Sequence, residues 1–432
     1  MNLKNKKVLV VGLGISGLAV ARFLKKKGAV VTVTDMAGEE KLFDYVREIR
    51  TMGIRLELES HSIKTFESAE LIVISPGVPH TIKPVKKAIA KGIPVIGEIE
   101  LASRFIDEPV IAITGTNGKT TTTRLLGKML EDSGIKVFVA GNIGNPLIEY
   151  VDTKKKAEVL VVEVSSFQLD TIDMFRPKIG VLLNIAEDHL DRYPDFAAYA
   201  ASKGRLFKNQ QKSDIAILND KDSLVRDVTE NINSKKIYFS EQTVAGSGLA
   251  ALNLSNEYFA AFHNKENAYA AALAALAGGG NLHGIQKALD TFKGDSHRIE
   301  YITTINDVMF YDDSKATNIA AVKRALESFD KPISLIMGGR DKGGDYLTLK
   351  GTVEKHVKKL VVIGEAKEKI ISALGGSVNV EQASTIEEAV LAAYKVAESG
   401  DVVLLSPACS SFDMFKSYKE RGNRFCMAAN SL

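Results

Sequence analysis

Short runs of valine, isoleucine and leucine alternate with longer helical patterns along the whole chain, and this alternation limits the possible folds more than any other feature. Runs such as 8–11 and 159–162 are apolar at consecutive positions, which is typical of strands buried on both faces of a parallel sheet. Crossover helices cover those faces. The sequence therefore predicts an α/β protein.

The strand-like runs fall into three groups, as expected for a chain of 432 residues, which is too long for one hydrophobic core. A break near 102–109 and a second one near 294–300 separate the groups. We predict a Rossmann-like domain at 1–97, a central P-loop-type ATPase domain with a mostly parallel sheet at 98–298, and a C-terminal Rossmann-like domain at 299–432. The runs are KVLVVG, VVTVTD, LIVIS and IPVIG; then 110–114, KVFVAG, EVLVVEV, KIGVLLN and DIAILN; then VMFYDDS, ISLIMGG, KLVVIG and DVVLLSPA.

The charge balance argues against a nucleic-acid partner. The net charge of +3 arises from 56 basic and 53 acidic residues that are dispersed along the chain, and tryptophan is absent.

The two cysteines cannot form a disulfide framework. The longest apolar stretches are far shorter than the ~20 residues of a membrane helix. We expect a soluble, cytoplasmic monomer that does not insert into membranes.

The segment TGTNGKTT at 114–121 follows an apolar run and opens a helical pattern. Gly115 and Gly118 allow the backbone N–H groups to turn toward a phosphate, Lys119 can reach the terminal phosphates, and Thr120 can offer its hydroxyl to Mg²⁺. The segment is shorter than the full P-loop pattern, because Ile113 stands where the first glycine is usual. A simple strand-to-helix turn is the alternative, but we favour ATP binding.

Three polar residues follow neighbouring apolar runs of the central group. Glu163 ends one run, and Asp188 and His189 follow another. Ligands of parallel sheets sit beyond the carboxyl ends of the strands, and Mg²⁺ prefers oxygen ligands. We therefore predict a metal site at this rim, with the imidazole as a minor partner.

A second glycine loop, GLGISG, lies near the N-terminus. Gly12, Gly14 and Gly17 follow the first apolar run, and Asp35 closes the second. This is the spacing of the dinucleotide fingerprint, although such a loop can hold any diphosphate at a helix N-terminus. The loop SPGVP at 75–79 is expected at the same rim, unless it serves only as a turn.

The C-terminal third carries polar residues after several strand-like runs. These are DDSKATN at 312–318, GGRDKGG at 338–344 and SPACSSFDMF at 406–415. Asn264 and Asn267 begin an alanine-rich helical pattern, where helix capping is an alternative role. Cys409 has no nearby base in the sequence, so we interpret it as a packed thiol.

Together these segments resemble the Mur ligase family over nearly the whole chain. The resemblance rests on GTNGKTTTT, EVSSFQL, NIAEDHLDRYPDFAAYAASK, HNKEN, SHRIE, DDSKATN and SPACSSFDMFKSYKERG, in the family's order. The segments DSKATN and SPACSSFDMF are similar to the D-glutamate-adding branch in particular.

The resemblance implies a role for each matching residue. Lys119, Glu163, His189 and Lys203 would be catalytic, and Lys203 is similar to the lysine that family members carbamylate with CO₂. The first glycine loop would then hold the UDP of UDP-N-acetylmuramoyl-L-alanine, with no nicotinamide involved. The implied ATP residues are Gly115, Thr116, Asn117, Gly118, Lys119, Thr120, Thr121, Asn264, Asn267, Arg298 and Asp313. The implied UDP-substrate residues are Gly14, Ile15, Ser16, Asp35, Ser75, Gly77 and Asn142. The implied D-glutamate residues are Lys315, Thr317, Lys342, Ser411 and Tyr418. Thr120, Glu163, His189 and Lys203 would organise two Mg²⁺ ions.

The implied reaction is a two-step ligation. A carboxylate of the UDP-linked substrate attacks the γ-phosphate of ATP, and the amine of D-glutamate then displaces phosphate from the acyl phosphate. We expect the third domain to close on the second during this reaction. Three alternatives remain: a ligase for another amino acid, an NAD-dependent oxidoreductase, and a nucleotide-binding module without catalysis.

Overall fold

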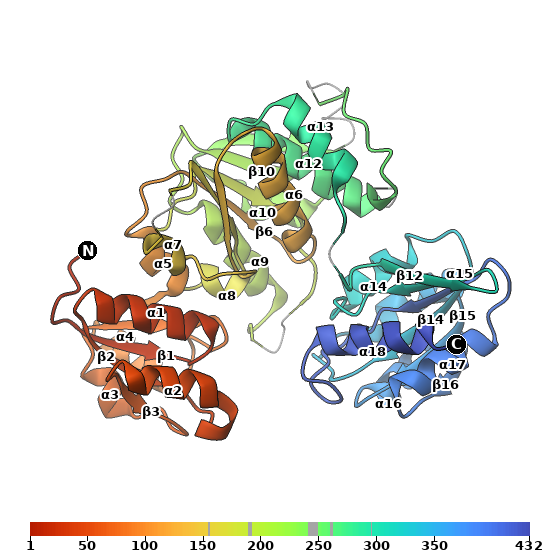
Figure 1. The fold of residues 1–432 in the computed structure, drawn as a ribbon, viewed down its shortest axis with the longest axis horizontal. Helices are drawn as coiled ribbons and strands as arrows, with labels where there is room; N and C mark the ends of the chain where they lie inside the picture. Colours follow the sequence, from red (N-terminus) through yellow and green to blue (C-terminus); the bar gives the residue numbers. More distant parts are fainter. Residues whose placement is uncertain (154–155, 189–191, 241–248, 260–261, 295) are drawn as a thin grey trace. The chain divides into compact units, whose positions relative to one another are not determined.

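The computed structural model describes residues 1–153, 156–188, 192–240, 249–259, 262–294 and 296–432 (Figure 1). The chain divides into two compact units. The first comprises Met1–Ile185, Ala197–Leu254 and Glu266–Thr291, and the second comprises Ala186–Phe196, Ser255–Lys265 and Phe292–Leu432. Two sheets belong to the first unit and one to the second.

The first sheet is fully parallel, with strand order β3-β2-β1-β4-β5. Its strands are β1 (Lys7–Val11), β2 (Val30–Thr34), β3 (Arg55–Glu57), β4 (Leu71–Ile74) and β5 (Val95–Gly97); its helices are α1 (Ile15–Lys26), η1 (Glu39–Leu42), α2 (Phe43–Thr51), α3 (Ile63–Glu67), α4 (Lys83–Ala90) and α5 (Glu98–Ser103). All four residues of β4 are buried, because helices cover both faces. The order reverses at β1 and β4, and the loops after these two strands therefore flank a crevice.

The second sheet is also parallel, with order β11-β10-β9-β6-β8-β7. Its strands are β6 (Val110–Thr114), β7 (Val137–Gly141), β8 (Val159–Glu163), β9 (Ile179–Leu182), β10 (Ile215–Asn219) and β11 (Lys235–Phe239). The helices of this region are α6 (Lys119–Asp132), α7 (Ile148–Val151), α8 (Ser166–Leu169), α9 (Phe196–Gly204), η2 (Arg205–Phe207), α10 (Ser223–Val228), α12 (Phe262–Ala277) and α13 (Leu282–Thr291). Ile113 pairs in register with Glu163, so the phosphate-type loop and this carboxylate emerge at the same level of the sheet.

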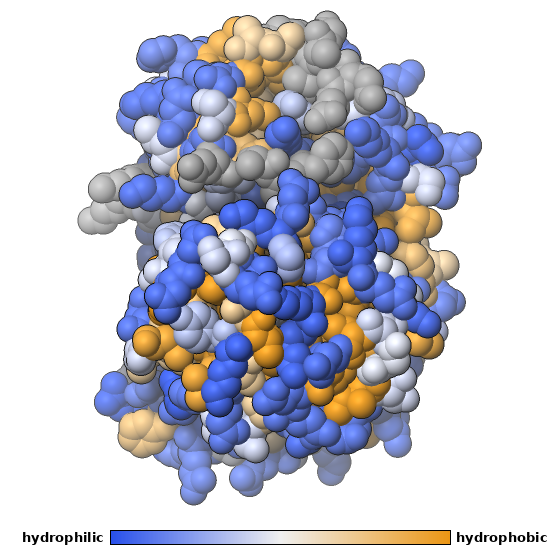
Figure 2. All heavy atoms as spheres, turned by 90° about the vertical axis from the view of Figure 1, so that its right-hand side faces the viewer, coloured by the Kyte–Doolittle hydropathy of each residue, from blue (hydrophilic) through white to orange (hydrophobic). Residues whose placement is uncertain are grey.

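The third sheet has the order β12-β13-β17-β14-β15-β16, and β12 alone runs antiparallel to its neighbour among the described strands. Its strands are β12 (Glu300–Ile305), β13 (Val308–Asp312), β14 (Ile333–Gly338), β15 (Val357–Ile363), β16 (Asn379–Gln382) and β17 (Val402–Leu405); the helices are η3 (Glu257–Phe259), α14 (Ile319–Leu326), η4 (Tyr346–Leu349), α15 (Lys350–His356), α16 (Lys367–Leu374), α17 (Ile386–Lys395) and α18 (Tyr418–Asn430). One apolar core lies under α14, α15 and α16, and the other lies under α17 and α18. In Figure 2 the face turned to the viewer is mainly hydrophilic, with smaller apolar areas between the polar side chains.

The predicted three-domain α/β class is confirmed, and every predicted strand is present. Among the strands of the described residues, four were missed: β3, β11, β12 and β16. All four lie at the edge of a sheet, where one side of the strand is unpaired. Their residues are mostly exposed or half-buried, so they lack the continuous apolar run by which the other strands were recognised.

A buried carboxylate ties α5 to the loop after α8. Glu100 accepts hydrogen bonds from the N–H groups of Asp173, Met174 and Phe175 at 2.9, 3.0 and 2.8 Å, and from Arg104 Nε at 2.7 Å. Burial by itself would raise the pKa of Glu100, but these donors outweigh it and lower the pKa. The carboxylate therefore adds stability above the unfolded-state pKa of the group, and this stability is lost as the pH falls through the folded-state pKa.

We predict that Glu100→Ala lowers the stability of the first unit by about 2–4 kcal/mol, because three N–H groups and a guanidinium lose their acceptor. Urea unfolding followed by fluorescence or circular dichroism measures the change. Glu39→Ala is the control, since Glu39 pairs with Arg50 at the surface, and such pairs contribute about 0–1 kcal/mol. Equal midpoints of the urea transition for Glu100→Ala and Glu39→Ala would contradict the stabilising role of Glu100.

Candidate functional site

The first glycine loop opens into a cavity of about 580 Å³ within the first unit. All seven residues expected for the UDP-linked substrate contribute to its lining: Gly14, Ile15, Ser16, Asp35, Ser75, Gly77 and Asn142. Asp35 accepts hydrogen bonds from the N–H groups of Leu13 at 2.6 Å and Ala37 at 2.8 Å. Its carboxylate therefore holds the glycine loop in shape and remains beside the cavity.

The phosphate-type loop turns at Gly118, where two constraints require glycine. Its φ of +82° lies in the left-handed region, and an added Cβ would lie 2.3 Å from Asn267 Oδ1. Asn267, one of the predicted ATP residues, thus covers the loop. Lys119 Nζ donates to the carbonyls of Gly115 and Thr116 at 2.9 Å each, which places the ammonium over the same loop.

Asn184 holds this loop in place and was missed by the sequence analysis. Its carbonyl and side-chain oxygens accept the N–H groups of Thr116 at 2.9 Å and Asn117 at 2.8 Å. Its amide donates to the carbonyl of Asn117 at 3.1 Å. The N–H groups of Thr116 and Asn117 are thus engaged by Asn184, so donors for an anion come mainly from the first turn of α6, whose N–H groups lack acceptors within the helix.

Glu163 is buried at the end of β8, and only one of its oxygens has a partner among the described residues. Oε1 accepts from Asn142 Nδ2 at 2.9 Å, whereas Oε2 accepts no hydrogen bond. A buried carboxylate oxygen without a donor fits a hard cation such as Mg²⁺. Thr120, at the first turn of α6, is a second oxygen donor of the type that Mg²⁺ prefers, and it is also buried.

Lys203 on α9 is only 1% exposed. Its Nζ donates to the carbonyl of Gly115 at 2.9 Å and lies 4.6 Å from the ring centroid of Tyr199. The predicted catalytic lysine is therefore beside the phosphate-type loop. His189, the remaining predicted catalytic residue, lies outside the described residues.

Asp188 belongs to the second unit. Its Oδ2 accepts from Asn318 Nδ2 at 3.0 Å, and its Oδ1 lies 3.9 Å from Lys342 Nζ. The position of Asp188 near Lys342 was not expected from its place after a strand of the central group.

The other predicted ATP residues belong to the second unit. Asp313 is buried and accepts from Ser406 Oγ at 2.8 Å. Burial raises its pKa to about 7, although Ser406 and the charge of Arg298 act in the opposite direction. Asn264, at the start of α12, donates to the carbonyl of Tyr258 at 2.7 Å.

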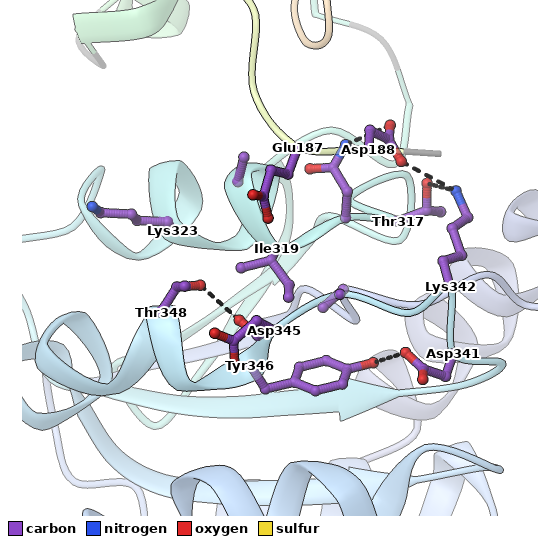
Figure 3. Close-up of a pocket in the computed structure, with 14 residues that line it drawn as sticks. Glu187, Asp188, Thr317, Ile319, Lys323, Asp341, Lys342, Asp345, Tyr346 and Thr348 are labelled. Carbon is purple, nitrogen blue, oxygen red and sulfur yellow. Dashed lines mark hydrogen bonds and ion pairs between the residues drawn. The ribbon is translucent and has the colours of Figure 1, made fainter. Parts of the chain in front are cut away.

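The predicted D-glutamate residues lie around the carboxyl ends of β13, β14 and β17. Lys342 Nζ lies 3.4 Å from Thr317 Oγ1, and both residues line a cavity of about 180 Å³ together with Asp188 (Figure 3). Lys315 Nζ lies 5.4 Å from the ring centroid of Tyr418. Ser411 is buried, and Lys315, Ser411 and Tyr418 are outside the lining of this cavity.

Cys409 is packed, as predicted. It is fully buried, its Sγ lies 3.0 Å from Tyr346 Oη, and burial raises the pKa of the thiol to about 11. A thiol with such a pKa is almost entirely protonated near neutral pH and is a poor nucleophile.

Gln168 is a second residue that the sequence analysis did not assign. It lines the 580 Å³ cavity, and its Oε1 accepts from the N–H and the hydroxyl of Ser165 in a capping box. The segment EVSSFQL carried the capping signal, but only the folded chain brings this residue to the cavity.

None of the helices in the described part of the chain has the length and apolar composition needed to cross a bilayer.

Three family models match successive parts of the chain: the Mur ligase MurD-like N-terminal domain at 6–97, the Mur ligase middle domain at 113–283, and the Mur ligase glutamate ligase domain at 297–409. Two relatives are each 52% identical to this chain: the UDP-N-acetylmuramoylalanine–D-glutamate ligases from Desulfosudis oleivorans and Desulfatibacillum aliphaticivorans. The first alignment covers 99% of this chain and 97% of the relative, and the second covers 100% of both. MurF from Thermotoga maritima, solved with ADP, has the same fold, with a TM-score of 0.61 at 17% identity over 99% of this chain and 95% of that one. The chain belongs to the Mur ligase family.

We predict that Asn184→Ala raises the KM for ATP at least about tenfold, because the loop loses its side-chain hydrogen bonds, each contributing about 1 kcal/mol. Steady-state kinetics with ATP varied at saturating co-substrates measures the change. Asn209→Ala is the matched control, since the side-chain amide of Asn209 donates to the carbonyls of Asp173 and Phe175, away from the phosphate-type loop. An unchanged KM would show that the loop keeps its shape without Asn184.

Proposed function

We propose that this enzyme ligates D-glutamate to UDP-N-acetylmuramoyl-L-alanine at the expense of ATP, through an acyl-phosphate intermediate, in the synthesis of peptidoglycan precursors. The full-length identity of 52% with relatives named for this reaction supports the substrate pair. We further propose that it acts in the cytoplasm as a monomer, with domains at 1–97, 98–298 and 299–432.

The observation that carries the proposal is the hydrogen bond between Asn142 and Glu163. Asn142 lines the cavity of the first glycine loop, and Glu163 ends the strand beside the phosphate-type loop. Asn142 therefore connects the cavity that we assign to the UDP-linked substrate to Glu163, the carboxylate that we assign to the phosphate site of ATP. This connection explains why one chain carries two glycine loops.

The acceptor carboxylate is activated in the first unit. Mg²⁺ would be held by Thr120, Glu163, His189 and Lys203 as its carbamate, and the bound ions would neutralise charge on the phosphates. Lys119 and the first-turn N–H groups of α6 hold the β- and γ-phosphates and stabilise the charge of a loose transition state. Asn142 orients the muramoyl-alanine end, so that its carboxylate attacks the γ-phosphorus and ADP leaves.

The amino acid is bound by residues of the second unit. The two lysines, Lys315 and Lys342, suit the two carboxylates of D-glutamate, and Thr317, Ser411 and Tyr418 supply shorter polar contacts. The amine attacks the acyl phosphate, and a tetrahedral intermediate then collapses with release of phosphate. The amine loses its proton in this step, which leaves a neutral amide.

We predict that phosphate release from ATP requires both UDP-N-acetylmuramoyl-L-alanine and D-glutamate. A coupled phosphate assay, with D-glutamate, L-glutamate, L-lysine and diaminopimelate offered in turn, tests the reaction. Release with D-glutamate alone is expected. Release with another amino acid would keep the mechanism and overturn the substrate, and release with none would favour the nicotinamide alternative.

We predict that the KM for ATP rises about tenfold as the pH falls from 8 to 6, since a carboxyl of pKa about 7 is only about one-tenth ionised at pH 6. The ionised carboxylate of Asp313 accepts hydrogen bonds from the nucleotide more strongly than the neutral acid does. The same raised pKa means that the ligand-free protein loses stability as the pH rises through about 7. ATP titrations over this pH range measure the effect. In the Asp313→Asn variant, residue 313 should contribute less to ATP binding, and its contribution should not change with pH. Identical pH profiles of the KM for ATP in wild type and variant would disprove the role.

A further inference from the structure

Arg421, on α18, is the largest side chain among those that are less than 2% exposed in the described structure. No carboxylate lies within ion-pair distance of it in the part of the chain that is described. Its guanidinium instead uses all five N–H groups on neutral oxygens. Nε donates to Ser314 Oγ at 2.9 Å, Nη1 to the carbonyls of Gly338 and Ser410 at 3.3 and 3.4 Å, and Nη2 to those of Ser314 and Cys409 at 2.8 and 3.1 Å.

These oxygens belong to three different loops. Ser314 follows β13, Gly338 ends β14, and Cys409 and Ser410 follow β17. The three strands are neighbours in the order β13-β17-β14, so their loops meet at one edge of the sheet. One cation therefore fixes the spacing of three loops that are up to 96 residues apart in sequence, as counted from Ser314 to Ser410.

The same loops carry four of the five residues that we assign to D-glutamate. Lys315 and Thr317 follow Ser314, Lys342 follows Gly338 and is drawn in Figure 3, and Ser411 follows Ser410. Tyr418 begins the helix on which Arg421 lies one turn further on, and its carbonyl accepts from Ser314 Oγ at 2.9 Å. We propose that Arg421 is a positioning residue that sets the geometry of the amino-acid site without touching the amino acid. This inference rests on the proposed function for the identity of the amino acid.

Two further observations favour a positioning role over simple packing. Burying a cation that makes no direct ion pair is unfavourable. Burial lowers the pKa of Arg421 to about 10, although the charges of Asp413, Asp312 and Asp313 act in the opposite direction, so the group stays charged near neutral pH. An apolar side chain would fill this space at lower cost. Moreover, Gly339 is required beside it, because an added Cβ would lie 2.3 Å from the Ser410 carbonyl and 3.1 Å from Nη1. The loops are therefore shaped around the guanidinium.

The planar fork cannot be replaced by lysine, whose three donors rotate about a single nitrogen. Arg421→Lys keeps the charge but removes at least two of the five hydrogen bonds that the guanidinium donates. We expect the KM for D-glutamate to rise at least about tenfold, the loss expected for hydrogen bonds from a charged group. The KM for UDP-N-acetylmuramoyl-L-alanine should change less than about twofold, since its cavity belongs to the first unit.

The experiment compares wild type, Arg421→Lys, Arg421→Ala and Arg424→Ala. Arg424 is the matched control, because it lies on the same helix and pairs with Glu387 at the surface. Hydrogen–deuterium exchange gives a readout that is independent of the substrate. Exchange should increase together at 314–317, 338–342 and 409–411 in both Arg421 variants, and added guanidinium ion should partly restore the KM of Arg421→Ala.

Three results would overturn the proposal: no change in the KM for D-glutamate, an equal rise in all three KM values, or increased exchange throughout the second unit without rescue by guanidinium. The last two would indicate a role in folding only. If wild type uses a different amino acid, the proposed substrate fails, and the same comparison of KM values is then made with that amino acid. The exchange result decides the positioning role in either case.

Discussion

Parallel strands all end at the same edge of their sheet, and the chemistry of this enzyme depends on that constraint. A loop that follows a parallel strand must emerge beside the loops of its neighbours, however distant they are in sequence. The loop of residues 12–16 thus meets 75–78, the phosphate-type loop meets Glu163, and Ser314 meets Gly338 and Cys409. Each sheet therefore brings together, at one edge, segments that are distant in sequence.

Alignment of the strands alone would leave these loops free to move, and buried polar side chains restrict them. Asp35 fixes the first glycine loop through Leu13, Asn184 fixes the phosphate-type loop through Asn117, and Arg421 fixes three loops of the third sheet. These side chains bond mainly to backbone groups; the bond from Arg421 Nε to Ser314 Oγ is the exception among the hydrogen bonds described above. Backbone contacts of this kind determine loop conformation directly, so residues on the loops can bind ligands while residues beneath them maintain the shape.

The sequence alone was sufficient to place the residues that we propose contact ligands, but it did not identify the residues that fix the loops on which they lie. Lys119 and Asp35 follow strands that are mainly apolar, and Glu163 ends another, so their positions could be inferred from the sequence. Asn184 also follows such a strand, but an asparagine at this position is equally typical of a turn at the end of the strand. Arg421 lies in a helix of mixed polarity, in which the exposed Arg424 is one turn away. Only tertiary packing distinguishes the two arginines, because Arg421 is buried against residues that include Gly338, more than 80 residues earlier in the chain.

The edge strands illustrate the same limit from the opposite side. β3, β11, β12 and β16 carry too few buried residues to be recognised by apolar runs, since their positions are specified mainly by backbone pairing with an inner strand. Backbone pairing and backbone-directed side chains thus share one property: neither requires a particular local pattern. A fold of this kind is encoded in two ways, with apolar runs that specify the inner strands and single polar residues that specify the loops. A substitution at one of these polar positions should alter a binding site while leaving the sheet intact, because the sheet is stabilised by the apolar cores on its two faces.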